Sequence, residues 1–153
     1  MDAPPPPPPT GLFQGTTHLF PLRVYYEDTD LSGVVYHANY LRWFERARSD
    51  MLRLLGVDQR TAAEAGEGVY TVAELAVRYL LPARLDDAVT VATEAIELGA
   101  ASVRLRQRAL RGGELLTEAA VRVGFISPDG RPRRQPAAWR AAFATVLAEK
   151  GAA

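Results

Sequence analysis

The residues best suited to chemistry in this 153-residue chain are concentrated between positions 25 and 40. This stretch contains carboxylates at Glu27, Asp28 and Asp30 and one of the chain's two histidines, His37. A carboxylate can attack an acyl carbonyl directly, or it can deprotonate a water molecule that attacks it. Taken singly, each residue also has an ordinary explanation, since aspartate is common in turns and a histidine beside a helix is often structural.

The same stretch leads into a predicted helix from Asn39 to Leu55. Asn39 is a favourable N-cap, and Gly56 is typical of the position that follows a helix. The first N–H groups of a helix have no partner within it, and the helix dipole favours negative charge there. Such N–H groups would polarise an acyl carbonyl oxygen and stabilise the oxyanion that forms on attack.

The rest of the pattern predicts a sheet that surrounds this helix. A first strand is expected from His18 to Tyr26, and a short helical piece at residues 58–65. Four more strands are expected at Val69–Leu81, Ala88–Leu98, Ser102–Arg111 and Leu115–Ile126, with a final helix at Pro136–Lys150. One helix followed by four closely linked strands predicts an α+β fold in which an antiparallel five-stranded sheet wraps around a long central helix.

The composition limits the chemistry that is available. The chain has no cysteine, which excludes a disulfide scaffold, a thiolate zinc site and a thiol nucleophile. Its 18 basic and 18 acidic side chains give a formal net charge of zero, which argues against a nucleic-acid partner or broad attraction to an anionic membrane. We expect no integral membrane segment, and the lack of a visible targeting segment predicts a cytoplasmic location.

The length fits one folded domain, predicted at residues 17–150. Residues 1–16 contain six consecutive prolines, Pro4–Pro9, and are expected to be a disordered polyproline II tail. The alternative is that the proline run is a ligand for an aromatic-lined groove.

The order of residues in the first stretch resembles a known family. The run Tyr-Tyr-Glu-Asp-Thr-Asp-x-x-Gly-Val-Val-Tyr-His-Ala-Asn-Tyr continues into Arg-Trp-Phe-Glu-Arg-Ala-Arg at residues 42–48. It closely resembles the signature of hotdog-fold acyl-CoA thioesterases. Within them it is most similar to the Tol–Pal-associated branch, which is related to the 4-hydroxybenzoyl-CoA thioesterases. A second similar segment lies at residues 79–87.

The resemblance implies a hotdog fold and hydrolysis of an acyl-CoA without a metal or a bound cofactor. By position, it assigns the essential carboxylate to Asp30 and the backbone N–H donor to the vicinity of His37. The His37 side chain is expected to orient the site or the attacking water. Whether Asp30 attacks the carbonyl or acts as a general base stays open.

The resemblance also implies a site shared between the subunits of a homodimer or homotetramer. It places Tyr70 and Thr71 in the partner's cleft as substrate contacts, although both residue types are ordinary in a strand. Because coenzyme A carries phosphates, a basic surface near the cleft is expected. Arg104, Arg106 and Arg108 alternate with apolar residues and suit phosphate recognition, so Arg104 and Arg106 are candidate contacts. The alternative is an ordinary solvated face.

Two other classes of function fit the same fold. Hotdog hydratases and dehydratases act on acyl thioesters, but the sequence lacks their Asp-x-Asn-Pro-x-His and His-Phe-Pro patterns. A non-catalytic acyl-thioester binder, or a partner protein of an envelope complex, would retain the fold. The intact cluster of acid, histidine and helix start argues against lost activity. The preferred acyl chain does not follow from the sequence.

Overall fold

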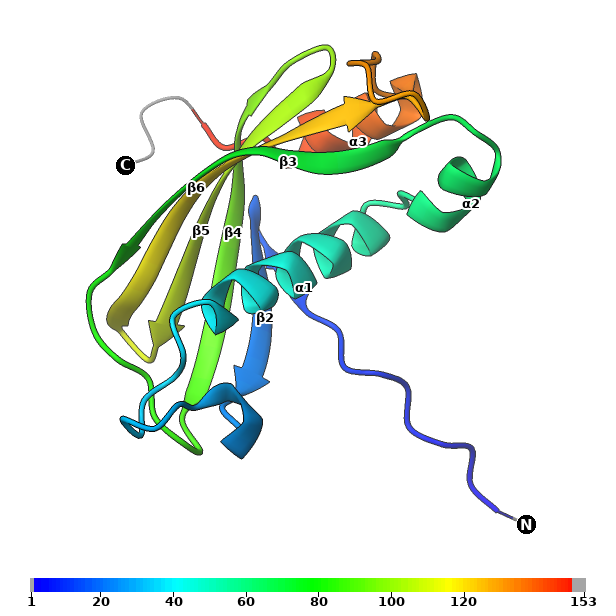
Figure 1. The fold of residues 1–153 in the computed structure, drawn as a ribbon. Coiled ribbons are helices and arrows are strands. Elements are labelled where there is room, and N and C mark those ends of the chain that lie inside the picture. Colours follow the sequence, from blue (N-terminus) through cyan, green and yellow to red (C-terminus); the bar gives the residue numbers. More distant parts are fainter. Residues whose placement is uncertain (1, 150–153) are drawn as a thin grey trace.

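A long helix, α1 (Asn39–Leu54), lies across the concave face of a six-stranded antiparallel sheet in the computed structural model, which describes residues 2–149 (Figure 1). The strands follow the spatial order β1 (Leu12–Gln14), β2 (Thr17–Arg23), β4 (Ala88–Leu98), β5 (Ser102–Arg111), β6 (Glu114–Ile126) and β3 (Val69–Tyr79). The shorter helices are η1 (Tyr26–Asp28), α2 (Gln59–Glu64) and α3 (Ala137–Thr145). No helix in the described part of the chain is both long enough and apolar enough to cross a bilayer.

The inner side of α1 explains why the sheet curls around it. Its buried apolar residues recur every three or four positions, at Tyr40, Trp43, Phe44, Ala47 and Met51. They form one core with the inward residues of the sheet, and burial of each large side chain contributes about 1.5–3 kcal/mol. The helix therefore has a fixed position, and its first residue is held beside the loop that contains Asp30.

The predicted α+β architecture is confirmed, with one strand more than expected. The short β1 pairs with β2 from Leu12↔Leu19 to Gln14↔Thr17, although the sequence analysis assigns residues 1–16 to a disordered tail. The tail prediction is wrong for this segment because Thr10 and Gly11 hydrogen-bond to the Asp50 carboxylate on α1, both at 2.8 Å, and so anchor the chain ahead of β1. The prolines that precede them are exposed.

Three predicted element boundaries differ from the structure by two residues or more, and several others differ by one. The first strand ends at Arg23 rather than Tyr26, because the Asp28 carboxylate accepts a hydrogen bond from the Tyr25 N–H and closes a helical turn there. The strand after α1 ends at Tyr79 rather than Leu81. The last helix ends at Thr145, and the predicted end at Lys150 lies outside the described residues.

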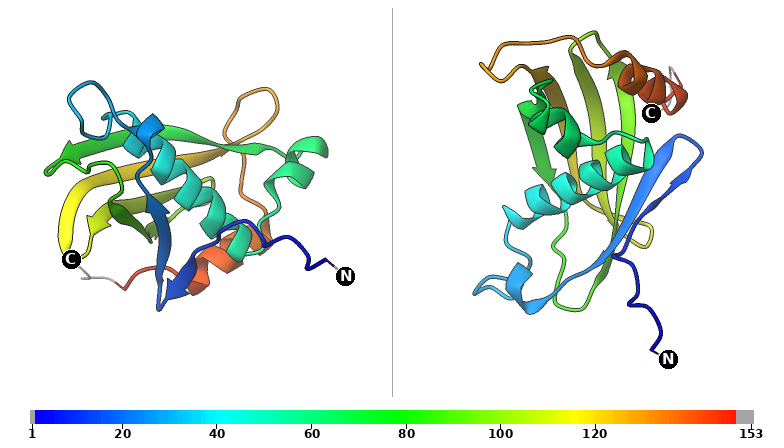
Figure 2. Two further views of the ribbon diagram at one scale, coloured as in Figure 1. Left: turned by 90° about the horizontal axis from the view of Figure 1, so that it is seen from below. Right: turned by 90° about the vertical axis from the view of Figure 1, so that its right-hand side faces the viewer.

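The β3 strand forms one edge of the sheet and is poorly covered. Within residues 2–149 it pairs only with β6, and its other ladder edge is unpaired. Helix α1 packs on β2 and β4. Figure 2 shows β3 at the edge of the sheet that is farthest from β2. Val72, Leu75 and Tyr79 consequently remain 45%, 42% and 47% exposed. This apolar edge is available for contact with another molecule.

Candidate active site

Asp30 lies at the tip of the loop between η1 and α1, and its carboxylate is fixed by the turn that contains it. The Asp30 N–H donates to the Val34 carbonyl, and the Gly33 N–H donates to the Asp30 carbonyl, both at 3.0 Å. Gly33 has a φ of +84°, a conformation that glycine adopts without strain. The Ser32 N–H, at 2.8 Å, and the Ser32 hydroxyl both donate to Oδ1 of Asp30. The carboxylate is therefore exposed but held in one orientation.

The same contacts favour the ionised form of Asp30. The hydrogen bond from the Ser32 hydroxyl, followed by that from the Ser32 N–H, lowers the pKa of Asp30 from its ordinary value, and the nearby His37 adds to this effect. Asp30 is thus a carboxylate at neutral pH. Its second oxygen, Oδ2, has no hydrogen-bond partner within residues 2–149 and is available to a substrate or a water molecule.

His37 lies immediately before α1 and presents an unused backbone donor. Its N–H group has no hydrogen-bond partner in the part of the chain that the structure describes. Its carbonyl accepts a hydrogen bond of 2.8 Å from the Tyr79 hydroxyl at the end of β3. The His37 ring packs between Tyr36 and Tyr79, with ring centroids 4.6 and 6.1 Å away. The Tyr79 hydrogen bond holds the peptide between His37 and Ala38, which directly follows the peptide that carries the unused His37 N–H.

Burial raises the pKa of the Tyr79 hydroxyl, so it keeps its proton and donates to the His37 carbonyl. A cavity of about 310 Å³ opens beside this contact. Its lining is largely apolar and consists of Val35, His37, Tyr40, Tyr79, Leu80, Leu81 and Pro82. The arrangement offers a carboxylate, a free N–H donor at a helix start and an apolar wall.

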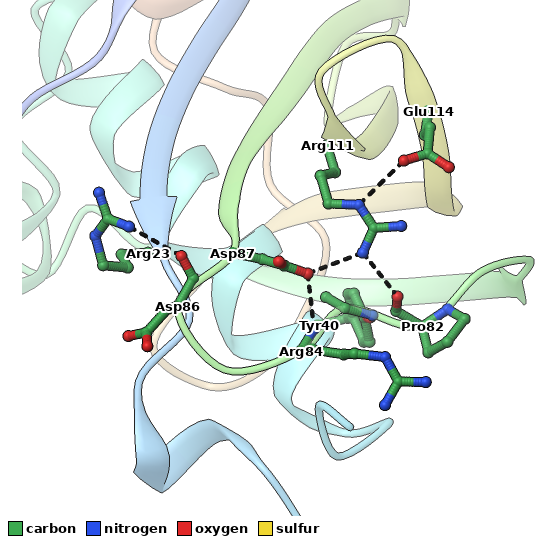
Figure 3. A network of polar contacts seen from close by, with 9 residues as sticks. Arg23, Tyr40, Pro82, Arg84, Asp86, Asp87, Arg111 and Glu114 are labelled. Carbon is green, nitrogen blue, oxygen red and sulfur yellow. Dashed lines mark hydrogen bonds and ion pairs between the residues drawn. The ribbon is translucent and has the colours of Figure 1, made fainter. Parts of the chain in front are cut away.

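The connection between β3 and β4 holds the Asp30 loop in position. Arg111 binds it through the Asp87 carboxylate at 2.8 Å and the Pro82 carbonyl at 3.1 Å, as Figure 3 shows. Ala83 within this connection donates its N–H to the Tyr40 hydroxyl, at 3.2 Å, and accepts the Val35 N–H at 2.9 Å. The loop of Asp30 is therefore tied to the sheet through backbone groups.

Comparison with known proteins identifies the family. A family model described as the thioesterase-like superfamily matches residues 24–147. The chain belongs to this superfamily. An acyl-CoA thioesterase, YbgC, from Haemophilus influenzae is 43% identical over 125 residues, which cover 78% of this chain and 92% of that protein. An acyl-CoA thioester hydrolase, YbgC, from Escherichia coli O157:H7 is 42% identical over 123 residues, with coverages of 79% and 91%.

Solved structures of thioesterases agree with the fold. A probable thioesterase from Bartonella henselae has a TM-score of 0.75 and 38% identity, and the match covers 78% of this chain and 99% of that one. A DHNA-CoA thioesterase from Staphylococcus aureus has a TM-score of 0.79 and 27% identity, with coverages of 85% and 90%. The hotdog fold predicted from the sequence is confirmed.

The structure brings two of the predicted site residues together. Asp30 and His37 lie at the same end of α1 and interact through charge without a direct hydrogen bond. Asp28, the neighbouring candidate, is structural in this thioesterase. Its Oδ1 accepts a hydrogen bond of 2.5 Å from the Asn39 amide, and its Oδ2 accepts the Tyr25 N–H at 2.7 Å. Asn39 was predicted to cap α1, but it is the first residue of the helix and its side chain binds Asp28 of η1 instead.

Tyr70 and Thr71 lie at the other end of β3, and one chain does not bring them to Asp30. Nine residues of extended strand separate Tyr70 from Tyr79, a span of roughly 30 Å. The Tyr70 ring packs against Phe125 and Trp139, and its hydroxyl donates to Gln135 at 2.5 Å. Thr71 is exposed on the unpaired edge.

Arg104 and Arg106 lie on the convex face of the sheet, away from α1. Their neighbours Val103 and Leu105 are buried in the core. Because successive residues of a strand point to opposite faces, the two arginines point outward. Arg106 forms an ion pair of 2.8 Å with the nearly buried Glu94, and Arg104 lies 3.6 Å from Glu74. Within one chain, these arginines are engaged by carboxylates and are not beside Asp30.

Sequence reasoning missed two residues of the site. Ser32 orients and ionises Asp30, and an Asp-x-Ser sequence in a turn is a detectable signal for that contact. Tyr79 binds the His37 carbonyl, but the two partners are 42 positions apart in the sequence. No local pattern could have revealed that second contact.

Proposed function

We propose that the protein hydrolyses an acyl-CoA thioester to a carboxylic acid and free coenzyme A, with Asp30 as the reacting carboxylate. Membership of the thioesterase-like superfamily makes it a thioester hydrolase, and the relatives named above are acyl-CoA thioesterases. The observation that carries the finer proposal is the exposed, ionised Asp30 in charge interaction with His37, whose N–H is unused at the start of α1.

The chemistry follows from these groups. The thioester oxygen accepts the His37 N–H, which together with the helix dipole stabilises the oxyanion of the tetrahedral intermediate. In one route Asp30 removes a proton from a water molecule as the water oxygen bonds to the carbonyl carbon. The C–S bond then breaks, and the thiolate of coenzyme A takes up that proton.

In the other route Asp30 attacks the carbonyl carbon itself and expels the thiolate. The resulting mixed anhydride is then hydrolysed by water, which restores the Asp30 carboxylate. Both routes use water as the only co-reactant. Both need an ionised Asp30, which its hydrogen bonds from Ser32 favour. The His37 ring is proposed to orient the substrate or the attacking water.

The site is proposed to be completed by a second copy of this chain, as a homodimer or homotetramer. The unpaired ladder edge of β3 and the exposed side chains of Val72 and Leu75 support this proposal. A two-fold pairing of two β3 strands is antiparallel. It would bring the Val69–Val72 end of one strand, with Tyr70 and Thr71, beside the site end of the other. The cytoplasmic location remains a prediction.

The test is release of free thiol from a panel of acyl-CoAs, from short aliphatic to aromatic. The wild-type protein is expected to hydrolyse at least one of them. Asp30→Asn, which keeps the shape but removes the charge, is expected to lower turnover by at least about 100-fold. Glu27→Gln is the matched control, because Glu27 is an exposed acid three residues away with no ion pair within residues 2–149.

Two results would contradict the proposal. One is the absence of thiol release across the whole panel, which would favour a non-catalytic binder. The other is full activity of Asp30→Asn, which would show that another group carries out the reaction. Size-exclusion chromatography that found only monomers at assay concentration would separately contradict the shared site.

A further inference from the structure

A second cavity lies between the C-terminal half of α1, the start of β3 and α3, away from the His37 pocket. It has a volume of about 310 Å³. The apolar part of its wall is formed by side chains from α1, β3, β5, β6 and α3, including Val72, Leu105 and Phe143. Thr71, at the exposed edge of β3, is also part of the lining. The remaining lining is polar and includes Glu45, Arg48 and Gln59. A cavity of this size that combines an apolar wall with polar groups is typical of a small-molecule site.

Arg48 is the polar group that distinguishes this cavity. Its Nη1 donates to Oε1 of Gln107 at 2.9 Å, and Gln107 is fully buried. Gln107 is itself fixed, because its amide donates to the Phe44 carbonyl at 2.9 Å and to the Thr93 hydroxyl at 3.0 Å. The guanidinium is thus anchored at one nitrogen and held in place against the cavity wall.

The charge of Arg48 is not neutralised by an ion pair. No carboxylate within residues 2–149 lies in ion-pair contact with it. Burial lowers the pKa of Arg48, and the charge of Glu45 on the preceding turn opposes that effect only in part. A half-buried guanidinium has five N–H donors, and only one of them is used here. A bound carboxylate would compensate for the lost hydration.

We propose that this cavity receives the acyl group of the substrate and that Arg48 selects acyl chains that end in a carboxylate. The inference rests on the proposed function and on its shared site. Arg48 lies eleven residues after His37, about 16 Å along α1, which is too far for a short acyl chain within one subunit. The antiparallel pairing of two β3 strands brings the Thr71 side of this cavity beside the reacting groups of the other copy.

Glu45 lines the same cavity and provides an opposing charge. Its side chain is exposed, so water screens its charge more than that of Arg48. Removal of the Glu45 charge is therefore expected to strengthen carboxylate selection, while removal of the Arg48 charge weakens it. The two substitutions should act in opposite directions on one measured ratio.

The experiment compares two acyl-CoAs of equal length, glutaryl-CoA and pentanoyl-CoA, which differ by a terminal carboxylate. We measure the ratio of their kcat/KM values for the full-length wild type, Arg48→Met and Glu45→Gln. The wild type is expected to favour glutaryl-CoA. Arg48→Met should lower the ratio at least about 10-fold, the scale of one charge-assisted hydrogen bond, and Glu45→Gln should raise it.

The ratio does not depend on the fraction of folded enzyme, so partial loss of stability in Arg48→Met does not affect it. If Arg48→Met does not fold, Glu45→Gln still provides a test, because this substitution at an exposed position is expected to raise the ratio. Hydrolysis of both substrates with a ratio unchanged by either substitution would overturn the selection by Arg48 and leave the proposed function intact. No thiol release from any acyl-CoA by the wild type would overturn the proposed function, and this inference with it.

Discussion

The two histidines of the chain each lie near an aspartate at opposite parts of α1, yet the two pairs differ in burial and in direct contact. Nε2 of His18 lies 2.7 Å from Oδ2 of Asp50, and both residues are buried, with 0% and 4% exposure. Asp30 and His37 are exposed and interact only through charge. The comparison separates a pair that stabilises the fold from a pair that is available for chemistry.

In the buried pair, the carboxylate of Asp50 is fully occupied. It accepts hydrogen bonds from Thr10, Gly11 and His18. Burial alone would disfavour the charged form, but these hydrogen bonds outweigh it and hold the pKa of Asp50 below its usual range. No oxygen is left for a substrate, so the pair anchors residues 10 and 11 and, through them, β1.

The largest expected effect comes from breaking the buried pair. His18→Ala leaves the Asp50 charge buried with fewer partners and opens a cavity, so we expect the free energy of unfolding to fall by about 3–5 kcal/mol. Urea denaturation measures this change. His37→Ala, the matched control at an exposed position, should change it by less than about 0.5 kcal/mol. Equal losses of unfolding free energy in the two variants would contradict the conclusion that only the buried pair stabilises the fold.

A smaller effect is expected at the contact that supports the exposed pair. Tyr79→Phe removes the hydrogen bond to the His37 carbonyl, and loss of one neutral hydrogen bond should lower kcat about 5-fold. The control is Tyr36→Phe, because the Tyr36 hydroxyl has no partner within residues 2–149. Steady-state kinetics on the best acyl-CoA would detect the difference. Identical kcat values for the two variants would show that the hydroxyl of Tyr79 does not position the site.

The smallest effect concerns the pH dependence of the site. Asp30 must be ionised to act, so activity is lost as pH falls through its pKa. Ser32→Ala removes the largest cause of the lowered pKa, so the pKa rises and the acid limb of kcat/KM moves to higher pH. Activity at pH 7 should change little. A pH profile measured from pH 3 to pH 8 makes the comparison, and an acid limb that stays in place would mean that another group controls it.

The elements with strong local patterns could be predicted from the sequence. The strands Ala88–Leu98 and Ser102–Arg111 have the predicted bounds, and the central helix differs by one residue at its end. Their periodicity and flanking turns are local properties, so they need no knowledge of the rest of the chain. The ordered loop of Asp30 was recognisable for the same reason, since its residues are contiguous.

Features that depend on distant contacts could not be predicted. The three-residue β1 has no pattern of its own and is ordered because Asp50, about forty residues away, binds the chain just before it. The alternation of Arg104 and Arg106 was recognised, but their carboxylate partners on other strands were not. Tyr79 meets His37 only because the sheet wraps around α1.

The most direct test of this comparison makes the same isosteric change at both carboxylates. Turnover and the free energy of unfolding are measured for Asp30→Asn and Asp50→Asn. We expect Asp30→Asn to lose at least about 100-fold in turnover with unchanged stability, and Asp50→Asn to lose stability while each folded molecule retains its turnover. An Asp30→Asn protein that hydrolyses acyl-CoA at the wild-type rate would contradict the central claim that Asp30 is the reacting carboxylate.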